Sequence, residues 1–212
     1  MVEDIHQRVT ELLCSKICHD LISPVGAINN GIELLTDLTS GMQEDAVSLI
    51  GDSSRQVASR LAYFRHAFGG WGDGAAAEFG TIRRLVESHS NDNRMDLSWR
   101  QKPDDGDVVE KHAGKILLNL VLLAGECARR SATLEIAFAA PLDNLKLEIK
   151  LTGDRCALHP ETRTGFDQDL GAEDLTVRNV VAFYSGQIAQ ANRLVLKYSD
   201  ESPDSIEFNV TE

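Results

Sequence analysis

Four side chains near the start of the chain have the types and spacing needed for nucleophilic chemistry: Lys16, His19, Asp20 and Ser23. A histidine side chain has an ordinary pKa of about 6.5, so near neutral pH most of it is uncharged and one ring nitrogen has a free lone pair. His19 is therefore the predicted nucleophile. The ring becomes acidic as the new bond forms, so a neighbouring carboxylate that accepts the ring proton would stabilise the transition state. Asp20 is the candidate for this role.

Lys16 and Ser23 lie three residues before and four residues after His19, which places them on the same face of a helix. Either side chain could contact the oxygens of a group carried on the ring. Adjacent helical residues point in different directions, so Asp20 must bend back to reach the ring. Two other interpretations stay open here: Asp20 as a solvated charge, and Ser23 as a cap for a kink before Pro24.

A long amphipathic helix is predicted around His19, because apolar residues recur at three- and four-residue steps from Ile5 to Leu38. Pro24 lacks a backbone N–H and should kink this helix just after His19. After a short connection at 36–43, the apolar residues of a second helix are Val47, Ile50, Val57, Leu61, Phe64 and Phe68. Two helices alone leave apolar surface uncovered, so a two-fold-related copy is expected to complete a four-helix bundle. The chain is therefore predicted to be a homodimer.

A glycine cluster at 69–74 predicts a boundary between two domains. We expect a hairpin domain over residues 1–70, a linker over 71–79 and a second domain over 80–212. Helices are predicted over 81–90, 108–130 and 175–184, and strands over 95–101, 134–138, 145–151, 187–190, 194–198 and 206–210, with a turn at 141–144. The predicted fold class is α+β, a helical hairpin followed by an α/β sandwich with helices on one face of a mixed sheet.

The segment 17–24, Ile-Cys-His-Asp-Leu-Ile-Ser-Pro, resembles the phospho-acceptor box of two-component histidine kinases. In that family the box lies on the first helix of a dimeric four-helix bundle, and a second domain of histidine-kinase-like α/β sandwich fold binds ATP. Here the nucleotide motifs are degenerate. Leu123 stands where a second Asn should follow Asn119, and Glu173 and Asp174 stand where glycine amides should face the phosphates. Two carboxylates would oppose a triphosphate.

A kinase-like fold without nucleotide chemistry resembles the ChpT-type histidine phosphotransferases of alphaproteobacteria. The resemblance implies a phosphorelay in which His19 takes a phosphoryl group from the receiver aspartate of a hybrid kinase and passes it to the receiver of a response regulator, without ATP. It implies no cofactor on this chain, with Mg²⁺ held by the receiver. The predicted receiver contacts are a set of residues that follow His19 on the same helix, although they could equally face the bundle core: Ile22, Gly26, Ala27 and Ile28.

Composition restricts the other function classes. The net charge of −12 disfavours nucleic acid and anionic membranes, and the first residues lack the pattern of a secretory signal, so a cytoplasmic location is expected. Cys14 and Cys18 lack haem or zinc spacing and are predicted to be partly buried structural thiols. Two rival functions stay open: an ATP-dependent kinase with an unusual nucleotide site, and a non-catalytic dimer that binds receivers.

Overall fold

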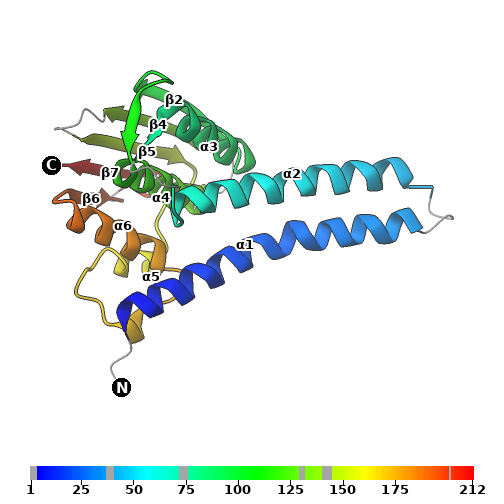
Figure 1. Ribbon diagram of the computed structural model, residues 1–212, viewed down its shortest axis with the longest axis horizontal. Helices are drawn as coiled ribbons and strands as arrows, with labels where there is room; N and C mark the ends of the chain where they lie inside the picture. Colours follow the sequence, from blue (N-terminus) through cyan, green and yellow to red (C-terminus); the bar gives the residue numbers. More distant parts are fainter. Residues whose placement is uncertain (1–3, 37–40, 72–75, 129–131, 140–144, 201) are drawn as a thin grey trace.

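The chain folds into a long helical hairpin joined to a domain built on a five-stranded sheet (Figure 1). The computed structural model describes residues 4–36, 41–71, 76–128, 132–139, 145–200 and 202–212. The hairpin consists of α1 (Ile5–Thr36) and α2 (Gln43–Ala67). Its far end projects away from the sheet domain, while its other end packs against it (Figure 1). The predicted hairpin and α+β fold class are confirmed.

Apolar residues of both hairpin helices are buried at the end nearest the sheet domain. Val9, Leu12 and Leu13 of α1 are buried, as are Tyr63 and Phe64 of α2. These residues belong to the core that this end of the hairpin shares with the sheet domain. Helix α1 continues through Pro24 to Thr36 as one helix, because a proline removes a single backbone donor and the flanking turns retain theirs.

The sheet domain has strand order β2-β4-β5-β7-β6, with β2 and β4 parallel and the other neighbours antiparallel. Alternate residues of β4 and β5 are buried, as a sheet covered by helices on one face requires. The five strands are β2 (Met95–Gln101), β4 (Ala132–Ala139), β5 (Lys146–Gly153), β6 (Val195–Ser199) and β7 (Ser205–Thr211). Strands β1 (Ala76–Glu78) and β3 (Val108–Glu110) form a separate antiparallel pair.

The helices of the sheet domain are α3 (Phe79–Asp92), α4 (Lys111–Cys127), α5 (Pro160–Thr164) and α6 (Val180–Ala191), with a 3-10 turn η1 at Ala172–Asp174. Helix α4 is buried over nearly its whole length because it packs on the sheet as well as on α2, α3 and α6. One helix thus belongs to the core of the sheet domain and to its contact with the hairpin.

Three predicted element boundaries are wrong. The helix predicted over 108–130 begins only at Lys111, because residues 108–110 pair with β1 as a strand. The predicted helix over 175–184 begins at Val180, since the side chain of Asn179 accepts a hydrogen bond from the Thr176 amide at 2.8 Å and holds a loop there. The predicted strand over 187–190 is helical and belongs to α6. The predicted turn at 141–144 lies outside the described residues, as does part of the glycine cluster.

Candidate functional site

His19 lies on the surface of α1 with 81% of its side chain exposed. Its Nδ1 is 3.1 Å from Oδ1 of Asp20, so the carboxylate does bend back toward the ring. A carboxylate is an acceptor, which places the ring proton on Nδ1 and leaves the lone pair on Nε2. The Asp20 side chain itself is only 18% exposed. The arrangement presents one imidazole nitrogen to the solvent above a sheltered carboxylate.

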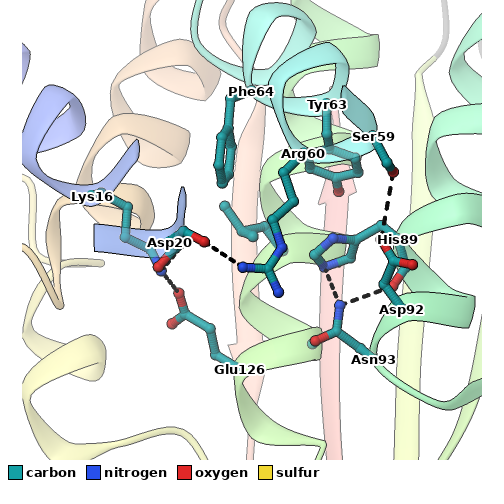
Figure 2. A pocket seen from close by; sticks show the side chains of 12 residues that line it. Lys16, Asp20, Ser59, Arg60, Tyr63, Phe64, His89, Asp92, Asn93 and Glu126 are labelled. Carbon is teal, nitrogen blue, oxygen red and sulfur yellow. Dashed lines mark hydrogen bonds and ion pairs between the residues drawn. The ribbon is translucent and has the colours of Figure 1, made fainter. Parts of the chain in front are cut away.

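Lys16 connects Asp20 to the sheet domain. Its Nζ lies 2.8 Å from Oδ2 of Asp20 and 2.8 Å from Oε1 of Glu126, which is near the end of α4 (Figure 2). Burial by itself would lower the pKa of Lys16, but the charges and hydrogen bonds of Glu126 and Asp20 outweigh burial and raise it. The lysine therefore stays protonated between two carboxylates.

The backbone of Asp20 is held by the second hairpin helix. In a regular helix the Asp20 carbonyl would accept a hydrogen bond from residue 24, but residue 24 is proline and has no N–H. Arg60 of α2 donates its guanidinium Nη1–H to this carbonyl instead (Figure 2). Pro24 thus leaves an acceptor free, and Arg60 uses it to tie the two helices together beside His19.

A polar cavity of about 180 Å³ lies beneath these contacts, between α1, α2, α3 and α4 (Figure 2). The ring of His89 lies in its wall, 4.5 Å from the ring of Tyr63 and with Nε2 3.2 Å from Nδ2 of Asn93. Burial, with the positive charges of Arg60 and Lys16, lowers the pKa of His89 to about 4, although Asp20 acts in the opposite direction. His89 is therefore neutral at physiological pH.

Sequence reasoning missed Arg60, His89 and Glu126 as parts of this site. They lie on three different helices, and no local spacing relates them to His19. The one available signal was Pro24 itself, because a proline inside a helix leaves an unpaired carbonyl four residues earlier.

The other predicted site residues lie further along α1. Ser23 is exposed and Ile22 is 72% exposed, whereas Gly26, Ala27 and Ile28 are partly buried. A Cβ added at Gly26 would meet no atom within 4 Å, so the surface beside it is open. Cys14 and Cys18 are exposed, which corrects the prediction that they are partly buried; Cys14 lines an open groove between α1 and α2.

Two polar residues of α4, one of them the Asn119 compared above with a kinase nucleotide motif, contact the hairpin. Asn119 is fully buried, and its Nδ2 donates to the Ala67 carbonyl of α2 at 3.4 Å. Lys115 donates to the Phe68 carbonyl at 3.2 Å and to the Tyr184 hydroxyl at 3.0 Å, and burial lowers its pKa. Among the described residues, no group of three or more His, Cys, Asp or Glu side chains is arranged to hold a metal ion.

An exposed histidine paired with a carboxylate on a helical hairpin, ahead of a sheet domain, is the arrangement expected of a phosphotransfer protein. The family model for the histidine phosphotransferase C-terminal domain matches residues 79–204. The chain is 30% identical over 180 residues to protein phosphotransferase ChpT of Brucella abortus (strain 2308), covering 84% of each protein. It is also similar to a solved bacterial phosphotransferase, with a TM-score of 0.82, 27% identity and 95% of each chain covered.

The chain therefore belongs to the ChpT-type histidine phosphotransferase family. The family resemblance predicted from the phospho-acceptor box at residues 17–24 is confirmed, and with it a role in phosphotransfer. None of the helices in the described ranges combines the length and apolar character that a membrane span requires.

Proposed function

We propose that this protein is a phosphohistidine carrier that relays a phosphoryl group between receiver domains through His19. The observation that carries the proposal is the exposed ring whose Nδ1 contacts Asp20 at 3.1 Å and whose Nε2 is free. A donor would be the phosphorylated aspartate of a hybrid kinase receiver, and an acceptor the receiver aspartate of a response regulator. Such receivers are cytoplasmic, so the carrier is proposed to act there too.

The proposed step exchanges one bond to phosphorus for another. The Nε2 lone pair of His19 attacks phosphorus, and the bond from phosphorus to the donor's aspartyl oxygen breaks, releasing the donor carboxylate. The ring is then a cation, with its proton on Nδ1 held by the Asp20 carboxylate. The reverse step on a second receiver returns His19 to its neutral form. The receiver would supply Mg²⁺, and this chain would supply position and charge.

Phosphotransfer without ATP is supported by the contacts between α4 and the end of α2. Lys115 and Asn119 both donate to backbone carbonyls at the end of α2, so this face of the helix is covered by the hairpin. A nucleotide bound against α4 there would have to displace that end of α2. The carboxylates of Glu173 and Asp174 add charge of the wrong sign for phosphate.

A homodimer is supported by the apolar surface of the hairpin. Seven of the nine exposed large hydrophobic side chains in the described ranges lie on α1, on α2 or directly before α2. An apolar groove between α1 and α2 continues this surface, lined by Val9, Leu13, Ile17, Leu61, Phe64 and Phe68 among others. A second hairpin would cover the groove and the exposed hydrophobic residues of α2 and complete the four-helix bundle, while Ile22 stays open to a receiver.

Receiver docking is proposed on the part of α1 that follows His19. Ile22 offers apolar contact, and the open space at Gly26 would admit a partner helix, with Ala27 and Ile28 beside it. Ser23 is the exposed side chain one turn after His19 that could contact a phosphoryl oxygen. The ammonium of Lys16 is already held by two carboxylates, which favours an action through Asp20 over a direct contact.

The test is transfer from a panel of radiolabelled, phosphorylated receivers to wild type and to His19→Ala, with His6→Ala as a control at another exposed histidine of the same helix. We expect wild type and His6→Ala to become labelled and to pass label to a second receiver. His19→Ala should still bind receivers but carry no label. Transfer that survives in His19→Ala would overturn the proposal.

Two further arms address the rival functions. Incubation with radiolabelled ATP and Mg²⁺ should leave the wild-type protein unlabelled, whereas label on His19 from ATP alone would identify an ATP-dependent kinase. Binding of receivers by wild type without any label on His19 would identify a non-catalytic dimer that sequesters them.

A further inference from the structure

A chain of charged contacts leads from the sheet domain to the imidazole. Glu126 of α4 contacts the Lys16 ammonium at 2.8 Å, Lys16 contacts one oxygen of Asp20 at 2.8 Å, and the other oxygen of Asp20 lies 3.1 Å from the ring of His19. Along this series of contacts, the Glu126 side chain is 32% exposed, and those of Lys16 and Asp20 are 12% and 18% exposed. The His19 side chain is 81% exposed. Only this last member of the series is freely presented to solvent.

We infer that Glu126 is a positioning residue for phosphoryl transfer, which acts on His19 through Lys16 and Asp20. This inference rests on the proposed function of His19. Glu126 touches neither the ring nor any group bound to it, so its role is to set the position and charge of Asp20. It would make the sheet domain a part of the transfer site.

The electrostatic reason lies in how many carboxylates share the lysine. Lys16 with Asp20 alone is a neutral pair, in which the ammonium draws the carboxylate toward itself and weakens its hold on the ring. With Glu126 present, the group of three has a net charge of −1, and the ammonium is divided between two acceptors. Asp20 then keeps more negative charge for the cation that forms on His19 when phosphorus bonds to Nε2.

Geometry supports the same role. Asp20 is held through its backbone by Arg60 (Figure 2) and through its Oδ2 by Lys16, which leaves Oδ1 directed at His19. Lys16 in turn cannot swing toward solvent without leaving Glu126. The carboxylate is thus fixed from α2 and α4 as well as from its own helix, and a carboxylate held in place before reaction needs no rearrangement during it.

The other charged or titratable groups that line the cavity beside these contacts are Arg60 and Tyr63 on α2 and His89 and Asp92 on α3. Arg60 is cationic and acts on the Asp20 carbonyl, while His89 is neutral because its pKa is lowered to about 4. Within the described residues, Glu126 is the carboxylate that pairs with Lys16 from outside α1.

The test is a double-mutant cycle on Glu126→Gln and Lys16→Met in the full-length protein. Glu126→Gln should lower the transfer rate constant at saturating phosphorylated receiver by roughly ten- to a hundredfold, with the receiver Kd unchanged. Because Glu126 acts through Lys16, the same substitution in the Lys16→Met background should change the rate less than about twofold. Glu148→Gln, which removes an exposed ion pair to Arg100 between strands of the sheet, is the matched charge control and should transfer like wild type.

A second readout follows the ring directly. Nitrogen NMR of His19 should show one tautomer, protonated on Nδ1, in wild type and in Glu148→Gln. In Glu126→Gln it should show a mixture of the two tautomers, which a general loss of stability would not produce.

The outcomes separate the inference from the function it rests on. If wild type transfers through His19 and Glu126→Gln transfers equally fast, the inference fails and the relay stands. Additive effects in the cycle, or a weakened Kd with an unchanged saturated rate, also overturn it, since Glu126 would then act independently or contact the receiver. If wild type carries no label on His19, both are overturned.

Discussion

At the scale of single residues, the site depends on groups whose ordinary behaviour is altered by their neighbours. Pro24 changes Asp20 by leaving its carbonyl unpaired, and Arg60 fills that position. His89 is changed by burial and by two nearby cations, which together keep its ring uncharged. The cavity wall beside Asp20 is therefore polar without adding a positive charge from histidine.

The lowered pKa of His89 predicts a pH dependence of stability. An unfolded histidine has a pKa of about 6.5 and the folded ring one of about 4, so the unfolded state binds the proton first as pH falls. The contribution of His89 to the free energy of unfolding is fully present above about pH 6.5. It is lost progressively as the pH falls from about 6.5 to about 4. The loss should be on the order of 3 kcal/mol, since each pKa unit corresponds to about 1.4 kcal/mol. In His89→Gln, the free energy of unfolding from urea titrations should fall less steeply over this range.

Comparing the two proteins isolates this effect. Burial also raises the pKa of Asp92, which acts with the opposite sign at low pH but is common to wild type and variant. Equal slopes in both proteins would show that the His89 ring already accepts a proton in the folded state.

At the scale of elements, the two hairpin helices approach each other closely at Gly31. A Cβ added there would lie 2.6 Å from Cγ1 of Ile50 and 3.2 Å from the Ala46 carbonyl oxygen. At Gly26, five residues earlier on the same helix, an added Cβ would meet nothing. The two glycines therefore have different reasons to be small: one admits α2, and the other leaves a surface open.

This contrast predicts opposite effects of the same substitution. Gly26→Ala should raise the free energy of unfolding by about 0.5–1 kcal/mol, because alanine is the better helix residue and has room. Gly31→Ala should lower it by about 1–2 kcal/mol, because the clash with Ile50 and Ala46 outweighs the helix preference. Urea unfolding followed by circular dichroism measures both. A stabilised Gly31→Ala would mean that the helices can separate there at little cost.

The same pair also tests the proposed docking surface. If a receiver helix uses the open space at Gly26, the more stable Gly26→Ala variant should bind phosphorylated receivers more weakly than wild type. Unchanged binding would move the docking surface away from Gly26.

At the scale of the whole molecule, α4 joins the hairpin to the sheet domain. Tyr63 of α2 donates its hydroxyl to the Leu118 carbonyl at 2.6 Å, and Lys115 and Asn119 donate back to the end of α2. The Tyr63 and Asn119 contacts are buried and the Lys115 contact is partly buried, so a shift of the hairpin along α4 would leave these polar groups without partners inside the interface. The position of the sheet domain against the hairpin is thus part of the fold.

The remaining exposed surface of the hairpin predicts the oligomeric state. Val47 of α2 is 60% exposed, and Val195 on the edge strand β6 is 47% exposed. If a second hairpin covers α2, Val47→Asp should raise the dimer dissociation constant by about tenfold or more, because a charge would be buried on association. Val195→Asp should leave it unchanged. Analytical ultracentrifugation over a range of concentrations measures both, and a monomeric wild type would contradict the proposed bundle.

The sequence by itself determined the features that depend on local pattern. Helical spacing of apolar residues predicted α1 and α2, alternation predicted β4 and β5, and the order of residues 17–24 predicted the family. These succeed because secondary structure and short motifs are read over neighbouring residues. The same reasoning was wrong for β3 and α6, where pairing with β1 and the hydrogen bonds of Asn179 decide the boundaries.

Only the tertiary structure decided which distant groups surround His19. Arg60, His89 and Glu126 lie about 40, 70 and 107 residues further along the chain, and nothing in their local sequence indicates a common site. Packing of α2, α3 and α4 against α1 brings them together. The physical reason is that a charge or hydrogen bond acts through space, whereas a sequence pattern records only what is near along the backbone.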